Sequence, residues 1–196
     1  MPKFTANYMQ PYAATWVKLF NTLGWNANER KVAVEIGSYE GASALWIAEN
    51  LLRAPDSQLY CIDPWLGDGA EERYQLFLKN VAETPARRKI THFREPSFRA
   101  LQRLLAEGLV ADLVYIDGSH AAPDVLADLV LAFRLVRIGG LIICDDYTWD
   151  DERFGGDDLV GRPKLAIDAF TTIYTRKIKL VRGLPIIQIA FTKLSD

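Results

Sequence analysis

An apolar run that ends in a carboxylate and two spaced glycines, Val32 to Ser43, constrains the fold of this chain more than any other stretch. Residues rich in Val and Ala are typical of a strand buried on both faces. The Ala, Leu, Trp and Ile residues that follow predict a helix beginning near Ala42. Gly37 and Gly41 allow a tight turn between strand and helix, where unpaired backbone N–H groups can meet a ligand. The stretch therefore predicts a nucleotide-sized site at the carboxyl end of a strand.

Strands and helices alternate along the rest of the chain. The predicted strands are Lys31–Glu35, Gln58–Ile62, Ile90–Phe93, Asp112–Ile116, Leu141–Cys144, Ile178–Arg182 and Ile186–Thr192. The predicted helices are Pro11–Leu23, Ala42–Arg53, Glu71–Ala82, Pro96–Leu105, Val125–Val136 and Lys164–Tyr174. Only Gly183 to Pro185 joins the last two strands, too short for a crossover between parallel strands. The sequence predicts an α/β, Rossmann-like, doubly wound, mostly parallel seven-stranded sheet with an antiparallel C-terminal edge hairpin.

The size and composition of the chain fit one compact domain. Of its 196 residues, 49% are hydrophobic, which is enough for a sizeable core. We expect a single domain over residues 1–196, in which residues 1–30 form an N-terminal helical extension. A net charge of -2 gives no overall basic surface, which disfavours long nucleic acid and favours a small-molecule partner. The sequence leaves the oligomeric state open, a homo-oligomer included.

The cysteines and the N-terminus indicate the compartment. Cys61 and Cys144 both lie in apolar runs, where cysteine usually acts as a small buried hydrophobe, and two distant cysteines make no disulfide framework. The N-terminus has no apolar segment of signal-peptide type, and no stretch approaches the length that spans a membrane. We therefore expect a cytoplasmic protein without a membrane partner.

Two carboxylates at strand ends indicate which nucleotide the turn binds. A dinucleotide-binding fold has G-x-G-x-x-G after its first strand, whereas this turn has only Gly37 and Gly41. Glu35 would repel a diphosphate but attract a cationic ligand, and Asp63 can accept hydrogen bonds from ribose hydroxyls. S-adenosylmethionine has an amine, a sulfonium and a ribose, so it matches both carboxylates.

The stretch E-I-G-S-Y-E-G-A-S resembles the first motif of class I S-adenosylmethionine-dependent methyltransferases, specifically the catechol O-methyltransferase-like and the macrocin or novobiocin O-methyltransferase-like groups. Two further segments, Y-I-D-G-S-H at Tyr115 to His120 and G-G-L-I-I-C-D-D-Y at Gly139 to Tyr147, are similar to the metal-site segments of those groups. The resemblance covers nearly the whole chain. The set in this order is more specific than the first motif alone.

The resemblance implies a set of cofactor contacts. Gly37, Ser38 and Gly41 would approach the methionine part of S-adenosylmethionine, and Ser43 would lie near its carboxylate. Asp63 would hold the ribose.

The remaining cofactor contacts that the resemblance implies lie further along the chain. Ser97 falls where these families place a residue beside the adenine, although Glu95 and Pro96 depart from the usual glycine-containing pattern. Trp65 would contribute an aromatic wall, and Asp117 would also lie beside the cofactor.

The resemblance further implies a divalent metal and a base. Asp117, Asp145 and Asp146 match the metal-binding positions of the metal-dependent members. Three carboxylates brought together repel one another without a proton or cation, and oxygen ligands suit Mg²⁺ or another hard divalent cation. His120 stands where the catechol enzymes have a lysine thought to take the proton of the substrate hydroxyl. An imidazole with an unperturbed pKa near 6.5 suits a general base at neutral pH.

Each of these assignments has a structural alternative. The three aspartates are also typical of caps and turns after buried strands. His120 beside a glycine could be a loop residue bonded to the backbone, and His92, inside a strand, is expected to be structural. Glu40 is interpreted as a solvated turn residue. Tyr147 and Trp149 follow the last metal position, which favours a role facing the substrate over simple coverage of the core.

The sequence predicts an enzyme that moves the methyl group of S-adenosylmethionine to a hydroxyl oxygen of a small molecule by direct displacement, with divalent metal help. The alternatives are a metal-independent methyltransferase, a hydroxylase-like relative and a non-catalytic S-adenosylmethionine-binding protein. An NAD-dependent oxidoreductase is disfavoured by the missing middle glycine. The loop Trp149 to Gly161 has no diagnostic chemistry, so the acceptor cannot be identified from the sequence.

Overall fold

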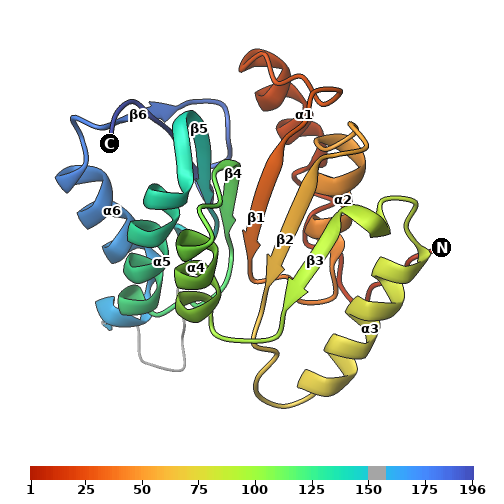
Figure 1. Cartoon of the computed structure of the whole chain (residues 1–196). Helices are drawn as coiled ribbons and strands as arrows, with labels where there is room; N and C mark the ends of the chain where they lie inside the picture. The colour runs from red at the N-terminus through yellow and green to blue at the C-terminus, as the bar shows by residue number, and fades with distance from the viewer. Residues whose placement is uncertain (150–157) are drawn as a thin grey trace. The chain divides into compact units, whose positions relative to one another are not determined.

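The computed structural model describes residues 1–149 and 158–196 (Figure 1). Its seven strands form a sheet in the hydrogen-bonded order β3-β2-β1-β4-β5-β7-β6. The chain divides into two compact units, Met1–Pro96 and Ser97–Asp196. None of the described helices is long and apolar enough to cross a membrane.

The first unit contains three parallel strands. Its elements are α1 (Ala13–Thr22), β1 (Val32–Ile36), α2 (Ala42–Asn50), β2 (Gln58–Ile62), α3 (Ala70–Glu83), the 3₁₀ turn η1 (Arg87–Lys89) and β3 (Ile90–Phe93). β2 pairs with both β1 and β3. All five residues of β1 are buried, as expected for a strand covered on both faces. Ile36 lies opposite Ile62, so Gly37 and Asp63 leave the sheet at the same level.

The second unit contains the other four strands. Its elements are α4 (Ser97–Ala106), β4 (Ala111–Ile116), α5 (Ala122–Leu135), β5 (Val136–Cys144), the 3₁₀ turn η3 (Leu159–Gly161), α6 (Pro163–Ile173), β6 (Ile178–Val181) and β7 (Ile189–Lys193). β4 and β5 pair in parallel, whereas β7 is antiparallel to both β5 and β6. Figure 1 shows α4, α5 and α6 in a row, and α5 packs against both of the others. Ile116 lies opposite Cys144, so Asp117 and Asp145 leave neighbouring strands together.

A buried lysine closes the C-terminal end of α5. Lys193 is 3% exposed, and its Nζ donates to the carbonyls of Phe133 at 2.9 Å and Val136 at 3.0 Å. These carbonyls lie at the end of a helix, where they lack partners within the helix. Lys193 therefore satisfies buried acceptors and contributes to the stability of this unit.

The predicted fold class is confirmed, including the antiparallel hairpin at the C-terminal edge, with β6 outermost. Gly139 and Gly140 lie inside β5, and a Cβ atom at Gly140 would be 2.6 Å from the Val136 side chain. The buried face of α4 is supplied by Ala100, Leu101 and Leu104, whereas Phe98 is 46% exposed.

Candidate functional site

The predicted site residues other than Ser97 fall into two clusters, one in each unit. The turn cluster comprises Glu35, Gly37, Ser38, Gly41, Ser43, Asp63 and Trp65. The carboxylate cluster comprises the predicted residues Asp117, His120, Asp145 and Asp146, together with two residues that bond to them, Tyr115 and Gln188.

The backbone of the turn after β1 is left-handed at three positions. The φ angle is 86° at Gly37, 47° at Tyr39 and 90° at Gly41. Gly41 directly precedes α2, and its N–H donates to the Ser38 carbonyl at 2.7 Å. A Cβ atom at Gly41 would lie 3.1 Å from the Phe77 ring. Both the conformation and the available space therefore require glycine at the start of α2.

Asp63 binds the backbone of this turn. Its Oδ2 accepts hydrogen bonds from the N–H groups of Ser38 at 3.0 Å and Tyr39 at 2.9 Å. Its Oδ1 accepts a hydrogen bond from the Trp65 N–H at 2.7 Å. A carboxylate has about four acceptor positions, so Asp63 can fix the turn and still accept from a ribose hydroxyl.

Glu35 is a fully buried acid beneath the turn. Its Oε2 accepts a hydrogen bond from the Ser38 hydroxyl at 2.6 Å. Its other oxygen, Oε1, is buried without a hydrogen bond of good geometry in the described part of the chain. Burial raises the pKa of Glu35 to about 7, against the opposing influence of Ser38, Ser43 and Cys61. A buried carboxyl whose second oxygen has no such partner suits a cationic ligand group.

Trp65 supports the turn from below. Its indole N–H donates to the Tyr39 carbonyl at 2.8 Å, and its ring packs against Tyr74 and Phe77 with centroids 4.8 Å and 5.0 Å apart. Its side chain is 3% exposed, so it is part of the packed core of this unit. Its role as an aromatic wall for a cofactor stays a prediction.

The interpretation of Glu40 as a solvated residue was wrong. Glu40 is 2% exposed, and its carboxylate accepts a hydrogen bond from the Thr5 backbone N–H at 2.7 Å and another from the Thr5 hydroxyl. The partner lies 35 residues away, so local sequence gives no sign of the contact.

A buried tyrosine joins two of the predicted metal ligands. The Tyr115 hydroxyl lies 2.9 Å from Asp117 Oδ2 and 2.5 Å from Asp145 Oδ2. Gln188 Nε2 also donates to Asp145 Oδ2, at 2.8 Å, and the Asp146 N–H donates to Asp145 Oδ1 at 2.8 Å. Burial raises the pKa of the Asp145 carboxyl, and the pKa of Tyr115 is raised by burial and by the two carboxylates.

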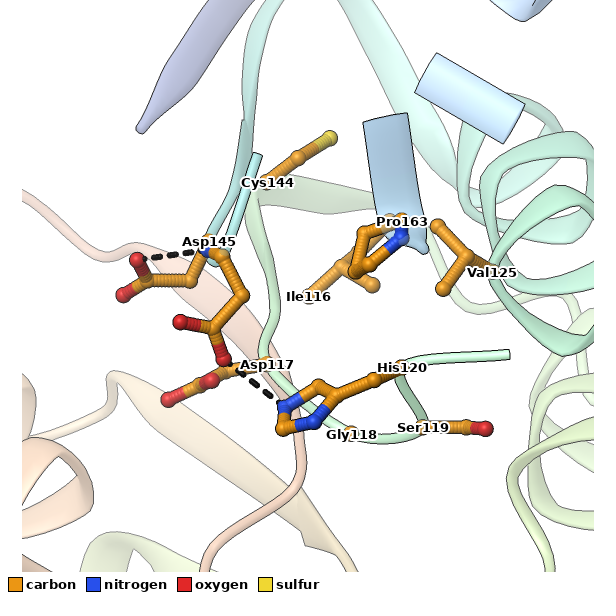
Figure 2. A pocket seen from close by; sticks show the side chains of 10 residues that line it. Ile116, Asp117, Gly118, Ser119, His120, Val125, Cys144, Asp145 and Pro163 are labelled. Atoms are coloured by element: carbon orange, nitrogen blue, oxygen red, sulfur yellow. Dashed lines mark hydrogen bonds and ion pairs between the residues drawn. The ribbon is translucent and has the colours of Figure 1, made fainter. Parts of the chain in front are cut away.

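His120 pairs with Asp146, the residue that follows Asp145 in the chain. His120 Nε2 lies 2.8 Å from Asp146 Oδ2, and the Trp149 ring packs on the imidazole with centroids 4.5 Å apart. Figure 2 shows Asp117, Asp145 and His120 among the side chains that line a cavity. The cavity has a volume of roughly 10 Å³. That volume is about the size needed by one water molecule. The structure thus brings the predicted base and the three aspartates to one cavity.

The carboxylate cluster fits a metal in its chemistry but not in its arrangement. All-oxygen ligands suit a hard divalent cation. However, Asp145 Oδ2 is bonded to Tyr115 and Gln188, and Asp146 Oδ2 is paired with His120. Within residues 1–149 and 158–196, no group of three acidic, histidine or cysteine side chains is placed to hold a metal ion. A cation would have to displace these partners.

Ser97, the residue predicted beside the adenine, bonds to a buried acid on α5. Asp128 is 2% exposed, and its Oδ1 is without a hydrogen-bond partner in the described part of the chain. Burial raises the pKa of Asp128 to about 6, and the hydrogen bond with Ser97 opposes this rise. Ser97 is therefore oriented by α5, and its contact with a cofactor stays a prediction.

Tyr147, predicted to face the substrate, bonds to α6. Its hydroxyl donates to Asp168 Oδ1 at 2.9 Å, and Lys164 Nζ donates to the Tyr147 hydroxyl at 2.8 Å. Residues 150–157 of the loop Trp149 to Gly161 lie outside the described residues.

Three residues of these sites were not predicted from the sequence: Tyr115, Gln188 and Asp128. For Tyr115 a signal existed, because side chains two positions apart on a strand share a face, and Tyr115 precedes Asp117 by two.

Comparison with known proteins identifies similar sequences. A family model described as a methyltransferase domain matches residues 34–147, which include the turn after β1 and the aspartates after β4 and β5. An uncharacterized protein of Acanthamoeba polyphaga mimivirus is 31% identical over 121 residues, or 58% of this chain. The match covers 50% of the length of this curated relative, so the chain spans about half of it.

Solved structures share the fold at low identity. The O-methyltransferase TomG from Streptomyces achromogenes, in complex with SAM, has a TM-score of 0.69 and 18% identity over 93% of this chain and 81% of its own. An O-methyltransferase from Bacillus cereus, in complex with SAH, has a TM-score of 0.70 and 16% identity over 96% and 84%. MycE from the mycinamycin biosynthetic pathway, in complex with Mg, SAH and mycinamycin VI, has a TM-score of 0.64 and 20% identity over 99% and 52%.

Proposed function

Because this chain belongs to the methyltransferase domain family, we propose that it transfers the methyl group of S-adenosylmethionine to a hydroxyl oxygen of a small molecule. The observation that carries the choice of oxygen is the pairing of His120 with Asp146, 2.8 Å apart, at a cavity. A histidine held in this way can take the proton of a hydroxyl group. The similarity in fold to O-methyltransferases is compatible with this choice.

We assign cofactor binding to the turn cluster. The N–H groups at the start of α2, next to Ser43, would bind the carboxylate of the methionine part. Glu35 would face the amine, because its uncompensated Oε1 is buried, and Asp63 would accept from the ribose. When bound, S-adenosylmethionine supplies an electrophilic methyl group on a positively charged sulfur.

His120 would act as the general base. If the proton on Nε2 points to Asp146, Nδ1 carries the free lone pair and can accept a proton. The acceptor hydroxyl would give its proton to Nδ1, and its oxygen would then take the methyl group that bound S-adenosylmethionine supplies. Asp146 fixes the tautomer and stabilises the imidazolium, and Trp149 restricts the ring to this orientation.

The assistance of Mg²⁺ or another divalent cation stays a prediction. Its support is the set of oxygen ligands from Asp117, Asp145 and Asp146, together with the Mg in the MycE complex. The present hydrogen bonds of Asp145 and Asp146 favour the metal-independent form of the same reaction. Methyl transfer measured before and after exhaustive chelation separates the two forms.

The experiment that tests the proposed function has two steps. Calorimetry with S-adenosylhomocysteine, and with NADH in parallel, measures which cofactor the wild type binds. Transfer of labelled methyl from S-adenosylmethionine to a panel of hydroxyl compounds then measures the reaction. Binding of S-adenosylhomocysteine without transfer would favour the non-catalytic binding protein, and binding of NADH alone would favour the oxidoreductase.

A further inference from the structure

A buried asparagine ties the N-terminal segment to the turn cluster. Asn80, on α3, is 1% exposed. Its Oδ1 accepts from the Lys3 N–H at 2.8 Å, and its Nδ2 donates to the Lys3 carbonyl at 2.8 Å. The same Nδ2 donates to the Glu40 carbonyl at 2.9 Å. One amide therefore connects three segments of the first unit: the N-terminus, the turn and α3.

The Glu40 side chain makes a second connection to the N-terminus. Its buried carboxylate accepts from the backbone N–H and from the hydroxyl of Thr5. Hydrogen bonds to an ionised acceptor are stronger than those between neutral groups. Glu40 is thus held through its main chain by Asn80 and through its side chain by Thr5.

These contacts act on the strained part of the turn. Glu40 lies between Tyr39, whose φ is 47°, and Gly41, whose φ is 90°. The Tyr39 ring contacts Tyr8 with centroids 5.9 Å apart and Arg73 at 5.6 Å. A left-handed tyrosine is unfavourable on its own, so surrounding contacts must maintain it. The N-terminal segment supplies several of these contacts.

We propose that residues 3–8 form a strap that holds the glycine turn in its cofactor-binding conformation, with Asn80 and Glu40 as positioning residues. The inference rests on the proposed function, because it takes the turn cluster as the cofactor site. If the turn leaves its binding conformation part of the time, the apparent Kd of its ligand rises. It equals the intrinsic Kd divided by the fraction of molecules whose turn is in the binding conformation. By linkage, a cofactor that stabilises the turn also stabilises the strap by the same factor.

Two variants loosen the strap without large changes of shape. Asn80→Asp keeps the oxygen that accepts from Lys3 but turns a second oxygen toward two carbonyl groups. Thr5→Val removes only the hydroxyl hydrogen bond to Glu40. We expect the Kd for S-adenosylhomocysteine, measured by calorimetry, to rise roughly tenfold in Asn80→Asp and roughly threefold in Thr5→Val.

A matched control separates positioning from general destabilisation. Lys193→Met removes buried hydrogen bonds to Phe133 and Val136 in the second unit. It should lower the melting temperature and leave the Kd for S-adenosylhomocysteine unchanged. If Asn80→Asp does not fold, Thr5→Val carries the test.

Hydrogen exchange gives an independent readout of the strap. The Lys3 and Thr5 amides donate to Asn80 and Glu40, so saturating S-adenosylhomocysteine should slow their exchange in the wild type. The slowing should match the factor by which breaking the strap weakens binding. Folded variants with wild-type Kd, or exchange that the ligand does not change, would overturn the strap alone. A wild type that binds no S-adenosylhomocysteine would overturn the cofactor assignment and the strap with it.

Discussion

Asp63 in the turn cluster and the aspartates of the carboxylate cluster are bound by different kinds of partner. Backbone N–H groups bind the Asp63 carboxylate, so its position follows from the main chain. The aspartates of the carboxylate cluster are bound mainly by the side chains of Tyr115, Gln188 and His120, with one backbone N–H, that of Asp146, on Asp145. Side-chain partners can be exchanged by rotation, whereas backbone partners move only if the turn changes conformation. The first arrangement suits holding a cofactor in one pose, and the second suits the exchange of protons or a cation.

The largest expected effect is that of a substitution in the carboxylate cluster, at His120. His120→Gln removes the proposed base and should reduce methyl transfer by about 10² to 10⁴-fold, with nearly unchanged affinity for S-adenosylhomocysteine. His92→Gln is the matched control, because His92 bonds to Tyr74 inside the first unit. Steady-state kinetics with the acceptor found by screening measure both. Full turnover of His120→Gln at every pH would rule out the base role.

The buried acid of the turn cluster should make stability depend on pH. The pKa of Glu35 is raised to about 7 from 4.5, so the folded state holds its proton more tightly than the unfolded state. The stabilisation is complete below pH 4.5 and is lost as pH rises to about 7, a loss of roughly 3 kcal/mol. Urea denaturation at pH 5 and pH 8 should show a smaller loss in Glu35→Gln than in the wild type, because the variant keeps only the contributions of Asp128 and Asp145, whose pKa values are also raised by burial. The exposed Glu107→Gln serves as the control, and an equal pH dependence in Glu35→Gln would contradict the prediction.

The same acid predicts a pH dependence of binding. The amine of S-adenosylhomocysteine favours ionised Glu35, so the ligand should bind more tightly at pH 8 than at pH 5. Glu35→Gln should weaken this trend. A trend of the opposite sign in the wild type would place the amine away from Glu35.

Asp63 bonds to the backbone of the turn and is also the predicted contact of the ribose, so substituting it tests both roles. Asp63→Ala should weaken S-adenosylhomocysteine binding by roughly 1.5 to 3 kcal/mol, because a charged hydrogen-bond partner is lost. Its bonds to Ser38, Tyr39 and Trp65 mean that part of this loss comes from the turn itself. Calorimetry of the wild type and Asp63→Asn, each with S-adenosylhomocysteine and its 2′-deoxy analogue, separates the contributions. If the wild type binds both ligands equally, the 2′-hydroxyl contact with Asp63 is absent.

The smallest expected effect concerns the shared hydroxyl of the carboxylate cluster. Tyr115→Phe removes the hydroxyl that lies within hydrogen-bond distance of both Asp117 and Asp145 and should lower the free energy of unfolding by roughly 1 to 2 kcal/mol. With this hydroxyl gone, the two carboxylates should respond more to Mg²⁺, so the thermal shift on adding Mg²⁺ should be larger in the variant than in the wild type. A large shift in the wild type, equal to that of the variant, would favour a metal site that forms despite Tyr115.

Much of the fold followed from the sequence, because local pattern and short connections constrain a parallel sheet. The strands Gln58–Ile62 and Ile90–Phe93 have the predicted bounds. The hairpin was predictable because three residues cannot cross between parallel strands. The aspartates gather at strand ends because neighbouring parallel strands finish at the same edge.

What the sequence by itself determined is the alternation of strands and helices, the glycine turn and the types of charged residue that end the strands. Tertiary structure alone decided which groups satisfy these charges. Gln188 reaches Asp145 across 43 residues, and Asn80 reaches Lys3 across 77. Periodicity reports only which face of an element is apolar, and it carries no information about the partner of a buried polar side chain. Glu40 was misread for this reason: a glutamate between glycines has the pattern of a solvated turn, and only the folded N-terminal segment buries it.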